Sequence, residues 1–120
     1  MRLYGIRGAT TVSENSSAEI IEKTRELLLG LIAKNNLCEE NVVSMIFTTT
    51  PDLTAEYPAK ACRLAGWNNT ALLGAVESDV PHGLPRCLRV LVHAYLPQGS
   101  KPAHLYLHEA VALRPDLAEL

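Results

Sequence analysis

The chain has 120 residues, of which 48% are hydrophobic and 20% charged, and its formal net charge is -2. A chain of this length buries roughly two-thirds of its surface on folding, so we expect one domain over residues 1–120. The small negative charge provides no basic field for nucleic acid or an anionic membrane, and no apolar run reaches the roughly 20 residues of a membrane span.

The cysteines and the N-terminal residues together indicate a cytoplasmic location. Cys38, Cys62 and Cys87 are odd in number, widely spaced and without a C-x-x-C motif. This pattern is typical of reduced thiols, which we expect to be half-buried. Residues 1–11 are strand-like and lack the apolar core and cleavage site of a signal peptide.

Residues 3–11 form the first predicted strand, in which Gly5 and Gly8 flank Ile6 and Arg7. Glycine on both sides of an arginine indicates close approach of another backbone or a ligand. A bulged edge strand with a solvated Arg7 explains the same residues equally well.

Residues 16–36 carry the pattern of an amphipathic helix. Ser16 is predicted to be its N-cap, with the Glu19 side chain returning to Ser16 in a capping box. Apolar residues then recur at helical spacing until Asn35 and Asn36, whose amides tolerate a left-handed cap. We assign this helix to packing and not to chemistry.

Residues 42–49 are β-branched and aromatic, which predicts a strand that ends at the turn 50–53. Pro58 then opens a short helix. Lys60 and Arg63 are three residues apart, so they project from one side of that helix. Such a pair is most often a solvated face, and the alternative is an anion-binding site.

Two apolar runs, residues 71–76 and 88–95, have the length of buried strands. Glu77 directly follows the first run, and Arg89 lies inside the second. A permanent charge in an apolar layer is costly unless it is paired. We therefore expect Arg89 either to be paired within the protein or to bind an anion.

Residues 103–108 alternate between apolar and polar, which predicts a last strand with His104, Tyr106 and His108 on one face. In an extended strand the two histidines are about 13 Å apart, so we expect no metal site there. Pro115 excludes a long regular helix in the tail.

The predicted order of elements is strand, helix, strand, helix and three further strands. It indicates an α/β (α+β-like) domain, a mixed β-sheet with helices on one face. The uncovered sheet face is then apolar, and oligomerisation is the usual way to bury such a face.

The chain contains no recognisable nucleophile motif and no glycine-rich phosphate loop. Its remaining reactive groups are mainly cations, and guanidinium groups suit a small polyanion through bidentate contacts. These cations are Arg7, Lys60, Arg63, Arg86, Arg89 and Arg114.

Five motifs in order resemble the monofunctional chorismate mutases of the trimeric α/β (AroH) class. They are GIRGATTV at 5–12, TPDL at 50–53, YPAKA with the arginine at 57–63, E..DV..GL..C.RVL at 77–91, and LYL…A..LRPDL at 105–117. Any one of them is weak, but together they span essentially the whole chain.

The resemblance implies a homotrimer in which three sheets surround a central barrel, with active sites between subunits. It implies an isomerase that rearranges chorismate to prephenate, the step of the shikimate pathway that leads to phenylalanine and tyrosine. The reaction is an intramolecular Claisen rearrangement that needs no cofactor, metal or covalent intermediate. Its transition state gathers negative charge on the ether oxygen, so fixed cations and a shaped pocket are what the catalyst requires.

The resemblance also assigns roles to individual residues. Three residues form the catalytic set. Arg89 is expected to donate to the ether oxygen and to a carboxylate, and Arg7 to bind a carboxylate with help from the Tyr106 hydroxyl. Glu77 is expected to accept from the ring hydroxyl. The neighbouring subunit's side of the pocket is lined by Tyr57, Ala59, Lys60, Arg63, Leu72 and Leu73. Leu113 and Arg114 belong to a C-terminal tail, residues 113–120, that is expected to be mobile and to close over the site.

Two positions depart from the family pattern. Gly74 replaces the usual cysteine or serine that contacts the hydroxyl side of the substrate, so any contact there must come from backbone or water. Tyr57 replaces the commoner phenylalanine and adds a hydroxyl to a pocket wall. Neither change removes the cationic core.

Two rival functions remain at this point. One is a non-catalytic trimer that binds a small carboxylate metabolite, with turnover reduced by Gly74. The other is the small trimeric imine deaminase family, which also binds a carboxylate through an arginine but whose own motifs are not visible here.

Overall fold

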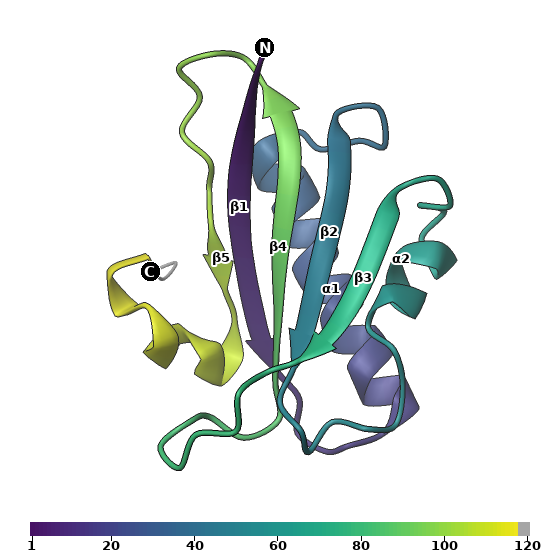
Figure 1. Cartoon of the computed structure of the whole chain (residues 1–120), viewed down its shortest axis with the longest axis vertical. Coiled ribbons are helices and arrows are strands. Elements are labelled where there is room, and N and C mark those ends of the chain that lie inside the picture. The colour runs from purple at the N-terminus through teal and green to yellow at the C-terminus, as the bar shows by residue number, and fades with distance from the viewer. Residues whose placement is uncertain (118–120) are drawn as a thin grey trace.

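The computed structural model describes residues 1–117, whose five strands form one mixed sheet in the order β3-β2-β4-β1-β5 (Figure 1). The elements are β1 (Arg2–Thr11), α1 (Ser17–Asn35), β2 (Val42–Thr49), α2 (Ala59–Leu64), β3 (Ala71–Val76), β4 (Cys87–Leu96) and β5 (Leu105–Tyr106), followed by two 3₁₀ helices, His108–Leu113 and Pro115–Leu117. The central strand β4 is antiparallel to β1 and β2, whereas β3 is parallel to β2 and β5 is parallel to β1. The predicted mixed sheet is confirmed.

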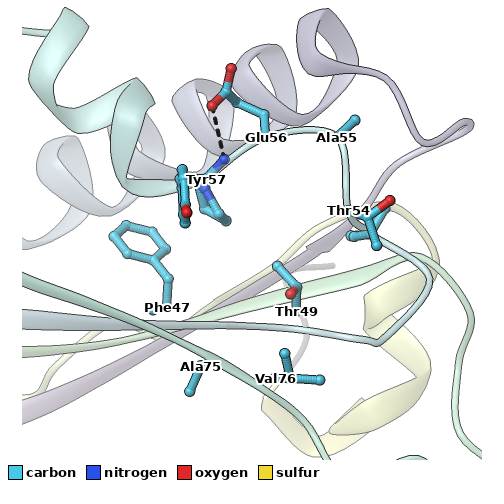
Figure 2. Close-up of a pocket in the computed structure, with 11 residues that line it drawn as sticks. Phe47, Thr49, Thr54, Ala55, Glu56, Tyr57, Ala75 and Val76 are labelled. Carbon is cyan, nitrogen blue, oxygen red and sulfur yellow. Dashed lines mark hydrogen bonds between the residues drawn. The ribbon is translucent and has the colours of Figure 1, made fainter.

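Both helices pack on one face of the sheet, as Figures 1 and 2 show from two directions. The core between the layers is made by alternate strand residues, such as Ile6, Met45 and Val92, and by Leu27 and Leu31 of α1, all at most 1% exposed. The opposite face is covered by neither α1 nor α2, so we call it the open face.

The N-terminus of α1 confirms the predicted cap but not the predicted capping box. Ser16 Oγ accepts from the Glu19 backbone N–H at 3.2 Å. The Glu19 carboxylate, however, accepts from the Ser13 hydroxyl at 2.8 Å. The prediction was wrong because the Ser16 backbone N–H already donates to the Glu14 carbonyl oxygen at 3.0 Å. At the other end Asn36 is left-handed, as expected, with φ 52°.

The close approach predicted near Arg7 is an approach of α1 to Gly8. A Cβ at Gly8 would lie 2.8 Å from Leu31 Cδ1 and 3.1 Å from Val90 Cγ1. Gly8 therefore allows the helix to pack tightly on β1. Its small size serves the core.

Strand β3 was predicted to be buried, and in the single chain it is not. Leu73 is 63% exposed and Val76 is 69% exposed. The reason is that β3 is an edge strand, paired only with β2, and that Leu73 lies on the open face, which has no covering layer. Val76 is the last residue of this edge strand. An apolar run gives the same signal whether its cover comes from its own chain or from elsewhere.

The last strand was predicted over residues 103–108 but comprises only Leu105–Tyr106. His108, with φ 52°, turns the backbone out of the extended conformation and begins the first 3₁₀ helix. This C-terminal segment packs on the open face, where Tyr106 and Ala110 form a small buried cluster with Ala9. Residues 118–120 of the predicted tail lie outside the described residues.

The cysteines are free, as predicted, but they are not half-buried. Cys62 and Cys87 are completely buried and Cys38 is exposed. Burial raises the pKa of Cys62 and of Cys87 to about 11, which keeps both thiols protonated. Within residues 1–117, no helix has the length and apolarity needed to cross a membrane.

Candidate active site

The predicted central arginine forms an ion pair on the open face. Arg89 Nε lies 3.1 Å from Glu77 Oε2, and the Thr48 hydroxyl donates to the same carboxylate oxygen at 2.7 Å. The Glu77 side chain is only 13% exposed, whereas that of Arg89 is 49% exposed. The expectation that Arg89 lies in an apolar layer was wrong, because β4 alternates and this position faces away from the helices.

The backbone holds both partners of this pair in place. The Glu77 N–H donates to the Thr49 carbonyl oxygen at 2.8 Å, which extends the pairing of β3 with β2 by one residue. Arg89 lies opposite Thr48 on β2 and opposite Ala9 on β1. Side chains at these three positions share the open face.

Arg7 and Tyr106 join Arg89 around a hollow of about 320 Å³ on this face. Arg7 lies two residues before Ala9 on β1, so it is a diagonal neighbour of Arg89 across the β1–β4 ladder. Tyr106 comes from β5, which pairs with the other edge of β1. Three strands thus bring together two guanidinium groups and a phenol.

A second hollow of about 520 Å³ is also lined by Arg89, together with Glu77 and the turns 50–52 and 78–85. Arg89 therefore stands between two cavities and can reach either one. Its Nε is engaged by Glu77, and a guanidinium carries four further N–H donors on its terminal nitrogens. This geometry provides a fixed cation whose outer edge is available to an anion.

Tyr57 and Gly74 line a third hollow, of about 430 Å³, between the sheet and the loop that precedes α2. Figure 2 shows Tyr57 on the loop side, with Phe47, Thr49 and Val76 on the side of the sheet. A Cβ at Gly74 would meet no atom within 4 Å. The missing side chain thus leaves space open in the wall of this hollow.

The other residues predicted for the neighbouring subunit's side do not lie with Arg89 in the single chain. Lys60 on α2 forms an ion pair with Glu56 at 3.2 Å, and Arg63 on the same helix is exposed. Ala59 and Leu72 pack against the main core. Leu73 is on the open face and exposed.

The predicted tail residues lie beside the first hollow. Leu113 packs against the cluster of Ala9, Tyr106 and Ala110. Arg114 is paired with Asp116, its Nη2 2.9 Å from Oδ2, and this hydrogen bond lowers the pKa of the Asp116 carboxyl. The tail thus presents a cation that is already held by an acid.

Sequence reasoning did not identify Thr48, although its hydroxyl is a direct partner of Glu77. The signal exists only once strand pairing is known, because Thr48 shares a face with Arg89 through the β2–β4 register. Sequence reasoning also did not identify the contact of His104 with β1, in which His104 Nδ1 accepts from the Arg7 backbone N–H at 2.9 Å. In the described part of the chain, no three side chains of the metal-binding types gather to hold an ion.

Comparisons with known proteins agree on one family. The family model for chorismate mutase type I matches residues 3–117. The chain is 45% identical to the chorismate mutase AroH of Bacillus subtilis, covering 98% of this chain and 94% of that protein. It is 47% identical to the chorismate mutase AroH of Thermus thermophilus, covering 94% of each. A solved chorismate mutase from Clostridium thermocellum superposes with a TM-score of 0.88 at 44% identity, covering 91% of this chain and 98% of that one.

Proposed function

The chain belongs to the type I chorismate mutase family, and on that premise we propose that it converts chorismate to prephenate at the hollow lined by Arg7, Arg89 and Tyr106. The observation that carries this proposal is the Arg89–Glu77 pair, in which one edge of a guanidinium is held by a largely buried carboxylate. The other edge is left for substrate. A cation fixed in this way needs little reorganisation when charge develops nearby.

In the proposed mechanism Arg89 donates to the ether oxygen as the C–O bond breaks and negative charge accumulates there. Arg7 binds a carboxylate of the substrate with the Tyr106 hydroxyl, and Glu77 accepts from the ring hydroxyl. Holding the substrate in its compact conformer removes most of the entropic cost of bringing the two reacting carbons together. In this mechanism no side chain forms a covalent bond or transfers a proton, and no step uses a cofactor or a metal.

We further propose that the active enzyme is a homotrimer with its sites between subunits. The open face exposes Leu73, Leu91 and Tyr95, 63%, 37% and 45% respectively, and an apolar surface of this kind favours self-association. The hollow with Tyr57 and Gly74 is separate from the hollow with Arg89 in one chain. In the trimer Tyr57, Ala59, Lys60, Arg63, Leu72, Leu73 and Gly74 of one subunit would complete the pocket of the next.

The wider setting follows from the same proposal. Residues 1–120 act as a single domain, and the family match over residues 3–117 supports this. The enzyme works in the cytoplasm, in phenylalanine and tyrosine biosynthesis, and its free cysteines accord with a reducing compartment. Leu113 and Arg114 on the tail cover the substrate, which the packing of Leu113 beside Tyr106 supports.

The test is the loss of chorismate absorbance with purified protein, measured with and without the Arg89→Ala substitution. Turnover by the parent protein and its loss in the variant support the proposal. Binding of chorismate without turnover in the parent would instead indicate the non-catalytic carboxylate-binding trimer.

A further inference from the structure

His104 lies where the last strand joins the sheet, next to the proposed carboxylate-binding pair, Arg7 and Tyr106. Its Nδ1 accepts the hydrogen bond from the Arg7 backbone N–H at 2.9 Å. Tyr106, two residues further along, is buried and lines the same hollow as Arg7. One imidazole ring therefore connects β1, at Arg7, with the strand that carries Tyr106.

This connection matters because the pairing between β1 and β5 is short. The register comprises only Gly8 with Leu105 and Ala9 with Tyr106. One further hydrogen bond, from the Leu107 N–H to the Ala9 carbonyl oxygen at 2.9 Å, extends it towards the C-terminus. At the opposite end the imidazole of His104 provides the acceptor for β1.

The segment before His104 is anchored to a different element. The Asn35 side chain at the end of α1 accepts from the Ala103 N–H at 2.8 Å and donates to the Ala103 carbonyl oxygen at 3.0 Å. The path of the chain into β5 is thus fixed by α1, and its contact with Arg7 is fixed by His104.

The hydrogen bond defines the protonation state of the ring. A backbone N–H can only donate, so Nδ1 must be unprotonated and the neutral ring carries its proton on Nε2. Partial burial, together with the positive charges of Arg7 on β1 and Arg114 on the C-terminal segment, lowers the pKa of His104 below its usual 6.5. Asp116, the acid nearest to Arg114, is already paired with it at 2.9 Å. Protonation would remove the acceptor and add a third cation beside the two arginines.

We propose that His104, in its neutral form, is a positioning residue that holds Arg7 and Tyr106 in register for the substrate carboxylate. This inference rests on the proposed function and assigns His104 no contact with the substrate. It predicts a dependence on pH in an enzyme whose chemistry uses no acid or base.

Two substitutions distinguish the effect of losing the hydrogen-bond acceptor at residue 104 from the effect of losing the imidazole ring. His104→Asn places an amide oxygen where Nδ1 stands, so kcat/KM near pH 7.5 is expected to stay within about twofold of the parent. His104→Leu removes the acceptor, and a loss of about tenfold is expected, mainly in KM, because Arg7 acts in binding. His108→Asn is the matched control, since His108 lies four residues away and contacts Glu26 at 2.8 Å instead.

The dependence of kcat/KM on pH distinguishes this positioning role from a purely structural one, which would leave that dependence unchanged. The parent enzyme and His108→Asn are expected to lose kcat/KM as the pH falls through the pKa of His104. His104→Asn is expected to lack that loss. Unchanged kcat/KM in His104→Leu, or the same acid loss in His104→Asn, would overturn the inference. Should His104→Leu not fold, the His104→Asn profile alone decides.

A measurement without substrate distinguishes this inference from the proposed function. The amide resonance of Arg7 in ¹⁵N-labelled protein is expected to shift with the titration of His104 in the parent and to stay constant in His104→Asn. If the protein has no turnover but this amide follows His104, the proposed function fails and the contact stands. If the amide does not follow His104, the inference fails whatever the turnover.

Discussion

Arg89 shows how the surroundings of one residue decide its use. Its Nε is held 3.1 Å from a Glu77 oxygen that also accepts from Thr48, so the guanidinium cannot rotate freely. Half of its side chain is nevertheless exposed, at 49%. An arginine that served only to satisfy Glu77 would not need that exposure, and this argues for a ligand at its outer edge.

Replacing Arg89 by alanine is expected to lower kcat/KM by at least ~10²–10³-fold, the usual effect of removing one transition-state donor. Arg89→Lys is expected to restore little of the lost kcat/KM, because an ammonium lacks the planar fork that lets a guanidinium pair with Glu77 and donate to the ether oxygen at the same time. Steady-state kinetics on both variants provides the measurement. Arg2 is an exposed arginine at the far end of β1, so Arg2→Ala is the control and should have the kcat/KM of the parent. A nearly unimpaired Arg89→Lys enzyme would contradict the idea that one guanidinium must contact both Glu77 and the ether oxygen.

Gly74 lies at the position where the family resemblance predicts a cysteine or a serine. A Cβ there meets nothing within 4 Å, so Gly74→Ala should be tolerated and should gain up to about 0.5–1 kcal/mol of stability, the usual advantage of alanine over glycine in a strand. Gly74→Ser adds a hydroxyl at the same place and is expected to lower the KM for chorismate by about threefold, the worth of one hydrogen bond. Thermal unfolding and steady-state kinetics on the matched pair separate the two effects. Equal KM values in both variants would show that no hydroxyl contact is made at this position.

At the scale of elements, the turn after β2 is tied to the start of β4 by a carboxylate. Asp52 Oδ2 accepts from the Arg86 backbone N–H at 2.9 Å, and its Oδ1 accepts from the Thr50 hydroxyl. Burial by itself would raise the pKa of Asp52, but these hydrogen bonds outweigh it and lower the pKa below 3.8. The tie orders the two turns that line the second hollow beside Arg89.

Asp52→Asn is therefore expected to destabilise the protein by about 1 kcal/mol at neutral pH, a value kept low because Asp52 is exposed. A lowered carboxyl pKa stabilises the folded state above about pH 3.8, the unfolded value, and this contribution is lost as the pH falls through the folded value. The difference between parent and variant should thus shrink as the pH approaches 3. Urea unfolding of both proteins at one concentration, near pH 7 and pH 3, gives the comparison. A difference that stays constant with pH would mean that the charge of Asp52 is not involved.

The elements that could be predicted from the sequence are those with a strong local signal. The cap at Ser16 and the left-handed Asn36 both depend on residues close together in the chain. The last strand was predicted too long because His108 takes up a left-handed conformation that alternation does not reveal. Short β5 exists only through its partner β1, which lies about a hundred residues away.

At the scale of the whole molecule, the family resemblance supplied what local patterns could not. Alternation on β1 and β4 does not by itself place Arg7 next to Arg89, because that requires the register between the two strands. Thr48 and His104 were missed as partners of Glu77 and Arg7 for the same reason. The exposure of β3 and the separation of Tyr57 from Arg89 are both expected if a neighbouring subunit completes each pocket.

Subunit complementation tests whether a neighbouring subunit completes each pocket. If each site takes Arg89 from one subunit and Lys60 with Arg63 from its neighbour, Arg89→Ala and the double variant Lys60→Ala/Arg63→Ala should each be nearly inactive alone. Each trimer that contains both chains holds one intact site among its three, where a subunit that keeps Arg89 meets a neighbour that keeps Lys60 and Arg63. Such trimers should therefore regain about a third of the parent activity.

Co-expression of the two differently tagged chains, followed by purification through both tags and the chorismate assay, provides the measurement. The matched control combines Arg89→Ala with Arg7→Ala, two residues that line the same hollow of one chain. No subunit in that mixture carries both arginines, so no activity should return. Recovery in neither mixture would mean that Lys60 and Arg63 do not reach across to Arg89. Recovery in both would mean that Arg7 and Arg89 of one chain do not serve the same site. Recovery in the first mixture alone requires a site shared between subunits, and it would explain why Tyr57 and Lys60 lie apart from Arg89 in a single chain.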